Sequence, residues 1–139
     1  MNWLLPAQTL LDLISADPNP AQAWAASIDT QTLRVSVISI AEAHASIQSL
    51  QDAGLRSRLT ADLTSFLALL KADAGPPLLF TEVHSAVWCA LMHDPSILDV
   101  PQSDRQVYAT AMHEGLAIVE EVRPETAILQ ALGVHIHVV

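Results

Sequence analysis

Residues 103–119, SDRQVYATAMHEGLAIV, contain the pattern that decides the fold. The first part predicts a helix, with Ser103 and Gln106 forming a capping box and Gly115 following the last turn. The next four residues, 116–119, are all apolar and predict a short buried strand. A helix that leads through one glycine into a buried strand is typical of a sheet covered by helices.

The same alternation of short apolar segments and helical segments extends over the rest of the chain. Its length of 139 residues fits one domain, residues 1–139. We expect helices between the strands, including one from a Ser39–Glu42 capping box to about Gly54 and a long one over 55–74. The pattern predicts an α/β fold: a three-layer α/β/α sandwich with a central, mainly parallel sheet. The expected strands are residues 3–5, 33–38, 78–80, 116–119 and 134–138.

Composition restricts where the protein works. Hydrophobic residues make up 51% of the chain, but charged, polar or proline residues interrupt every apolar run before the 18 residues of a membrane span. The first residues lack the basic and small-residue pattern of a signal peptide. Cys89 is the one cysteine, and its apolar surroundings predict a small buried side chain in a reducing, cytoplasmic environment.

The net charge of −9 restricts the partners. Six Lys and Arg residues stand against fifteen Asp and Glu residues, so the surface repels phosphate backbones at long range. The basic residues form no stripe with aromatic residues between them. Binding to a nucleic acid would therefore need positive charge from a metal ion or from a partner subunit.

Carboxylates follow or flank several of the predicted strands. Ligands bind beyond the carboxyl ends of parallel strands, and Glu42, Asp104, Glu120 and Glu121 are expected at that edge. Such an oxygen-rich pocket suits Mg²⁺ or Mn²⁺. Each residue also has a purely structural interpretation, because Glu42 completes a capping box, Asp104 complements a helix dipole, and the Glu120–Glu121 pair fits a solvated turn. His135 and His137 could bind a transition metal from one face of the last strand, or lie on the surface.

Three motifs together resemble the PIN-domain family, the nuclease fold of bacterial VapC-type toxins. They are Ile40-Ala41-Glu42 after a valine-rich strand, the 104–111 segment that closes with Gly115-Leu116, and the strand–turn–helix–strand ending of the chain. The resemblance spans the whole chain in order and spacing. It implies a Mg²⁺- or Mn²⁺-dependent endoribonuclease that forms homodimers and is captured by a small antitoxin protein. It also implies that Glu42 and Asp104 are catalytic metal ligands.

Two motifs depart from the family pattern. The first strand of the family ends in Asp-Thr-Asn, whose aspartate helps to hold the catalytic metal, whereas this chain has Pro6-Ala7-Gln8. Proline can neither ligate a metal nor donate a hydrogen bond. The last motif, usually Thr-Arg-Asn or Thr-Arg-Asp, is replaced by Glu120-Glu121-Val122. Asp12 is no substitute for the missing aspartate, because it is expected to face away from the crevice.

Two functions therefore stay open. In the first, the chain is a toxin–antitoxin-type PIN domain with a degraded acidic site, inactive or weakly active, kept as a dimerising or partner-binding module. In the second, it is an active endonuclease of single-stranded RNA that uses Glu42, Asp104 and a recruited Glu120 or Glu121. A mean hydropathy of +0.35 also predicts a homodimer. Its expected interfaces are two apolar helix faces: Leu59, Leu63, Phe66 and Leu70, and Val83, Val87 and Leu91.

Overall fold

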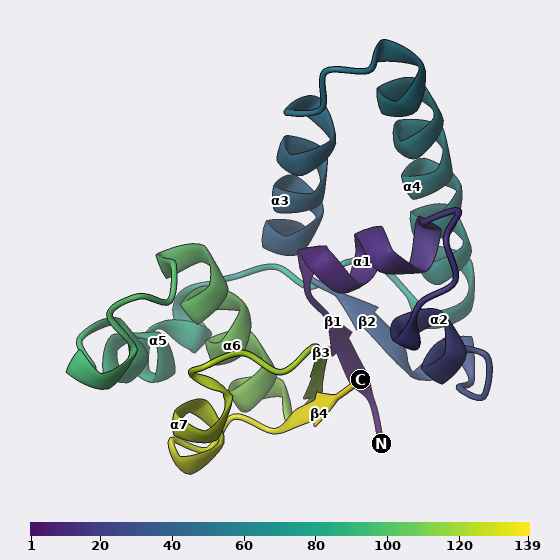
Figure 1. Ribbon diagram of the computed structural model, residues 1–139. Coiled ribbons are helices and arrows are strands. Elements are labelled where there is room, and N and C mark those ends of the chain that lie inside the picture. Colours follow the sequence, from purple (N-terminus) through teal and green to yellow (C-terminus); the bar gives the residue numbers. More distant parts are fainter.

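The computed structural model describes residues 1–139 and contains one sheet of four parallel strands (Figure 1). The strands lie in the order β2-β1-β3-β4. Residue Leu4 pairs with Arg34 on one side and with Ile118 on the other. The predicted α/β sandwich with a parallel sheet is confirmed. The strands are β1 (Trp3–Leu5), β2 (Leu33–Val35), β3 (Ala117–Glu120) and β4 (Ile136–Val138).

Helices cover both faces of the sheet. Figure 1 shows α1, α3 and α4 on one side and α5, α6 and α7 on the other, with α3 and α4 forming a hairpin that projects beyond α1. Single 3₁₀ turns η1 (Thr30–Thr32), η2 (Glu82–His84) and η3 (Pro95–Ile97) occur between them. The α-helices are α1 (Ala7–Ile14), α2 (Pro20–Ala25), α3 (Val37–Gln48), α4 (Ala53–Ala74), α5 (Ser85–Met92), α6 (Gln102–Glu114) and α7 (Thr126–Ala131).

Alternate strand residues supply the two halves of the core. Leu4 and Ile118 pack with the cluster that α5, α6 and α7 bury, whereas Leu5 and Val119 pack with α1, α3 and α4. All four side chains are fully buried. Successive residues of a strand point to opposite faces, and a sheet covered on both sides therefore has continuously apolar strands.

The start of α3 differs from the sequence prediction. The strand expected over 33–38 ends at Val35, because the Ser36 side chain caps α3 by accepting a hydrogen bond from the Ser39 backbone N–H at 3.1 Å. The Ser39–Glu42 capping box is therefore not formed, and α3 ends at Gln48. The strand expected over 78–80 is reduced to one bridge between Leu78 and Ser36.

The start of α6 also differs. Its N-cap is Pro101 and Ser103 lies inside the first turn, so the Ser103–Gln106 capping box is not formed. Gly115 ends the helix as predicted, with a left-handed φ of 68° that favours glycine. Cys89 is exposed, contrary to the prediction of a buried side chain, because α5 turns Leu91 toward the core and Cys89 toward solvent.

Both predicted dimer faces lie largely in the core. In the second face, Leu91 is buried and Val87 packs against the core, whereas Val83 is 52% exposed. The first face is buried as well. Leu63 and Leu70 are buried, and Leu59 and Phe66 pack against the same cluster. The apolar face of α4 therefore packs into the core and does not form an outer surface. No helix combines the length and the apolar character that crossing a membrane requires.

Candidate functional site

An acidic crevice of about 370 Å³ lies at the carboxyl ends of β1 and β3. The strand register pairs Leu4 with Ile118, so the residues two positions further, Pro6 and Glu120, both lie at this edge. Ligands bind at this edge in parallel α/β sheets. The lining residues are Pro6, Ala7, Gln8, Thr9, Asp12, Glu42, Ser46, Asp104, Glu120, Glu121, Val122 and Arg123.

Three elements bring three of the predicted carboxylates to this crevice. Glu42 comes from α3, Asp104 from the first turn of α6, and Glu120 is the last residue of β3. Thr9 ties α1 to the same edge, because its buried hydroxyl donates to the Val119 carbonyl. Pro6 follows β1 directly and lines the crevice, as the sequence predicted for the position where the family carries aspartate.

Glu42 does not cap α3, so the purely structural interpretation of this residue does not hold. With Ser36 as the N-cap, the Glu42 carboxylate instead accepts a hydrogen bond from the Ser103 hydroxyl at 3.2 Å. Partial burial raises the pKa of the Glu42 carboxyl, and the nearby negative charge of Asp104 raises it further. The ionised form of Glu42 is therefore disfavoured in the folded protein.

Replacing Glu42 with glutamine is expected to stabilise the protein near pH 7. A carboxyl whose pKa is raised by folding loses stability as the pH rises from its ordinary value of 4.5 through the raised pKa. The advantage of the variant should therefore shrink on acidification, when Glu42 of the wild type takes up its proton. Urea unfolding of both proteins across this pH range measures the difference, with Glu82→Gln on the surface as the control. A variant that is less stable than wild type at neutral pH would contradict the cause given for the raised pKa.

Glu120 is held by two other residues of the crevice. The Tyr108 hydroxyl donates to both oxygens of the Glu120 carboxylate, at 2.9 and 3.1 Å. Burial raises the pKa of Glu120, although Arg123 and the Tyr108 hydrogen bond act against the rise. Burial, followed by the charge of Glu120, also raises the pKa of Tyr108, so the phenol stays a hydrogen-bond donor.

Arg123 is a further residue of the candidate site, and no sequence motif predicted it. Its Nη1 lies 3.3 Å from Asp104 Oδ2, and its Nη2 lies 3.7 Å from Glu120 Oε2. Burial lowers the pKa of Arg123, but Tyr108, Glu120 and Asp104 more than offset this effect and the net pKa is raised. The signal in the sequence was its place as the first basic residue after β3, in a chain with only six Lys and Arg residues.

The other predicted residues lie at the outer part of the crevice. Glu121 and Val122 line it but are exposed. Asp12 also lines it, so the prediction that Asp12 faces away is wrong: the direction of α1 keeps this residue on the crevice wall, where it accepts a hydrogen bond from Gln8. No three carboxylates of the crevice bring their oxygens within 4.8 Å of one another.

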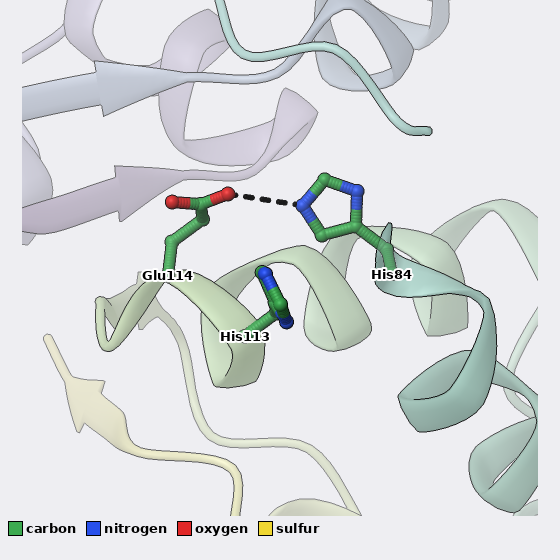
Figure 2. Close-up of side chains that lie close together, drawn as sticks. All are labelled: His84, His113 and Glu114. Atoms are coloured by element: carbon green, nitrogen blue, oxygen red, sulfur yellow. Dashed lines mark hydrogen bonds and ion pairs between the residues drawn. The ribbon is translucent and has the colours of Figure 1, made fainter. Parts of the chain in front are cut away.

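A group of three metal-ligand side chains lies elsewhere, at the end of α6. Figure 2 shows His84 from η2 facing Glu114, with His113 beside them. The ligand atoms of these three residues lie within 4.8 Å of one another. The His84 Nε2 atom is 3.1 Å from a Glu114 carboxylate oxygen.

Hydrogen bonding argues against a metal at this second group. The Thr81 backbone N–H donates to His84 Nδ1 at 3.0 Å, so the lone pair of the neutral ring is on Nδ1 and the proton is on Nε2. That proton is donated to Glu114. A metal on Nε2 would need the opposite tautomer, which would turn two N–H groups toward each other. The group is therefore a hydrogen-bonded link between η2 and α6.

Of the two histidines predicted on the last strand, His137 lies in β4 and His135 directly precedes it, and both are exposed. The ring centroids of His137 and Trp3 are 5.3 Å apart, and those of His137 and Trp24 are 6.0 Å apart. Neither His135 nor His137 belongs to a group of three ligands. His137 thus extends an aromatic stack at the side of the sheet.

Comparison with known proteins gives matches among solved structures and none at the level of sequence. No family model matches the sequence, and no curated protein matches it either. Among solved structures, FitAcB from Neisseria gonorrhoeae superposes with a TM-score of 0.76 at 21% identity, covering 96% of this chain and 94% of that chain.

Two further structures extend the likeness. VapBC2 from Rickettsia felis, bound to a DNA fragment from its promoter, superposes with a TM-score of 0.74 at 13% identity, covering 100% and 99% of the two chains. VapBC-5 from Mycobacterium tuberculosis, a member of the VapBC family of toxin–antitoxin systems, gives 0.69 at 18% identity, covering 99% and 98%. The toxin component of these complexes is a PIN domain. The chain therefore has the fold of the VapC-type PIN-domain toxins.

Proposed function

We propose that this chain is a partner-binding PIN-fold protein of the toxin–antitoxin type, in which the acidic crevice has lost its metal-dependent nuclease function or keeps only a weak remnant. The observation that carries the proposal is Pro6 at the carboxyl end of β1, inside the crevice that Glu42, Asp104 and Glu120 line. A carboxylate at this position would extend the ligand set, whereas proline offers no donor.

The arrangement of the remaining donors supports the same proposal. Mg²⁺ and Mn²⁺ sites gather oxygen ligands at short range, and Mg²⁺ demands near-octahedral geometry. Here no three carboxylates bring their oxygens within 4.8 Å of one another, and Tyr108 and Arg123 already bind Glu120. As placed, these side chains do not fit a divalent metal.

The alternative is an active Mg²⁺- or Mn²⁺-dependent endonuclease of single-stranded RNA. One observation favours it: Glu42 and Asp104 lie close enough for the charge of Asp104 to raise the pKa of Glu42, on the wall of a crevice that opens to solvent. In this alternative Glu120 or Glu121 would complete the ligand set.

An RNA cleavage assay separates the two functions. The purified protein is incubated with single-stranded RNA of mixed sequence and millimolar Mg²⁺ or Mn²⁺, beside its Asp104→Asn variant. We expect equal, background cleavage by both proteins. Cleavage by the wild type that disappears in Asp104→Asn would establish the active enzyme and end the proposal of a degraded site.

A second groove supports a partner-binding role. It has a volume of about 380 Å³, runs between α1 and the α3–α4 hairpin, and has an apolar floor. It shares Gln8, Asp12 and Ser46 with the acidic crevice, so the groove and the crevice adjoin. The floor consists of Leu11, Ile47, Leu50, Leu55 and Leu59.

We propose an antitoxin-like protein segment as the occupant of this groove and the adjoining crevice. Neighbouring structures such as VapBC-5 belong to toxin–antitoxin systems. A segment with apolar side chains for the groove and a basic side chain for the crevice would match both parts, in a chain whose net charge is −9. The single cysteine, with an exposed thiol, fits a cytoplasmic complex.

A homodimer is also part of the proposal. With the α4 face buried in the core, we place the interface at the apolar surface around η2 and α5, where Leu79 is 63% exposed and Val83 is 52% exposed. Ala86 and Ala90 continue this surface along α5. We expect light scattering at tens of micromolar to give the mass of a dimer, and Val83→Glu to give that of a monomer. A wild-type protein that is monomeric under these conditions would contradict the proposed interface.

A further inference from the structure

Arg123 is the one basic residue among those that line the acidic crevice. Its guanidinium contacts two elements at once, through Asp104 at 3.3 Å in α6 and Glu120 at 3.7 Å in β3. The guanidinium carbon also lies 5.9 Å from the centre of the Tyr108 ring. The positive charge is therefore placed between two carboxylates, over an aromatic face.

The backbone holds Arg123 at this position. Its N–H donates to the Thr126 hydroxyl at 2.9 Å, and Thr126 is buried at the start of α7. The Glu120 side chain is only 7% exposed and that of Arg123 is 32% exposed. This ion pair is thus more shielded from water than the exposed pairs that contribute little to stability.

The charge balance of the crevice points to the same role. One guanidinium faces three carboxylates, those of Glu42, Asp104 and Glu120. A divalent cation would bring two positive charges where Arg123 brings one.

We propose that Arg123 is a built-in counter-ion that takes the place of a divalent cation between Asp104 and Glu120, so that a metal ion can enter only when the guanidinium leaves. The inference rests on the proposed function, and it adds the residue that keeps the acidic crevice stable and closed to metal. Arg123 is a positioning residue in this account, since it acts on Asp104 and Glu120 and touches no reacting atoms.

Thermal melts of Arg123→Gln, with and without Mn²⁺, test the proposal. Without metal, the variant should melt roughly 3–6 °C below wild type, because its carboxylates repel one another without a counter-charge. Micromolar Mn²⁺ should restore this loss in the variant and leave wild type unchanged. Arg58→Gln, which removes the same charge from an exposed site on α4, is the matched control and should respond to neither change.

Each outcome separates this inference from the proposed function. If neither wild type nor Arg123→Gln responds to Mn²⁺, the counter-ion role is wrong and the degraded site stands. If wild type responds as strongly as the variant, a metal binds beside Arg123 and both proposals fail. Should Arg123→Gln not fold, the double variant Arg123→Gln/Asp104→Asn is expected to recover stability, because it removes one of the unpaired carboxylates. A double variant no more stable than the single one would overturn the inference.

Discussion

Replacing Arg105 with alanine is expected to reduce the free energy of unfolding by about 3–5 kcal/mol. Arg105 is buried in α6 and forms no ion pair with any carboxylate. All of its hydrogen bonds go to backbone carbonyls. These are the carbonyls of Val100 at 2.9 Å, Leu91 at 3.1 Å, Met92 at 2.8 Å and Ile97 at 2.6 Å.

The size of this effect follows from the Val100 and Met92 carbonyls, which would be left without donors. The Leu91 and Ile97 carbonyls keep backbone N–H donors. Leu91 and Met92 end α5, and their carbonyls point out of the last turn, where a cation is favoured. Each buried carbonyl that loses its donor costs about 1–3 kcal/mol. A domain is stabilised by only about 5–15 kcal/mol in total, so the variant should be close to unfolding.

Urea unfolding of a variant series checks the cause. Arg105→Met keeps most of the volume but none of the donors, and should be nearly as unstable as the alanine variant. Arg105→Lys keeps the charge without the planar fork, and should fall between methionine and wild type. Arg58→Ala on the exposed side of α4 should change stability by less than about 0.5 kcal/mol. A methionine variant as stable as wild type would show that packing, and not the carbonyl network, gives Arg105 its importance.

Replacing Pro6 with aspartate is expected to tighten Mn²⁺ binding by on the order of tenfold or more, because it adds a carboxylate to the crevice wall. The fold should tolerate the change. Pro6 is the N-cap of α1 and makes no side-chain cap, whereas aspartate is a favoured N-cap residue. This gain offsets the loss of the restricted proline backbone, and stability should change by less than about 1 kcal/mol.

Calorimetric titration with Mn²⁺ measures the effect of Pro6→Asp. Gln51→Asp adds the same charge in an exposed loop and should leave the affinity unchanged. Combining Pro6→Asp with Arg123→Gln should tighten binding further than either change alone, since one adds a ligand and the other removes the competing cation. A folded Pro6→Asp/Arg123→Gln variant that binds Mn²⁺ no more tightly than Arg123→Gln would mean that the metal position of the fold is not at the end of β1.

The elements that the sequence predicted well are those that local patterns determine. Four apolar segments became strands of one parallel sheet, and Gly115 ended α6 with a left-handed backbone. The convergence of Glu42, Asp104 and Glu120 on one crevice followed from the rule that parallel strands end at a common edge.

The errors arose where one local signal competed with another, or where distant residues decide. Both predicted capping boxes failed, because Ser36 caps α3 three residues earlier and Pro101 starts α6 ahead of Ser103. The β-branched residues Val37 and Ile38 favour a strand, but they lie in the first turn of α3 because Ser36 caps the helix directly before them. The contacts of Arg105 and Arg123 depend on carbonyls and carboxylates that are distant in sequence or come from other elements, and no spacing rule reports them.

Titration of Mn²⁺ into the unmodified protein, followed by calorimetry, tests the central claim most directly. In the proposed function the crevice, lined by Pro6 and neutralised in part by Arg123, is not a resident metal site. We therefore expect no saturable binding at micromolar Mn²⁺. A micromolar dissociation constant that disappears in Asp104→Ala would contradict this expectation and would place a metal ion in this crevice.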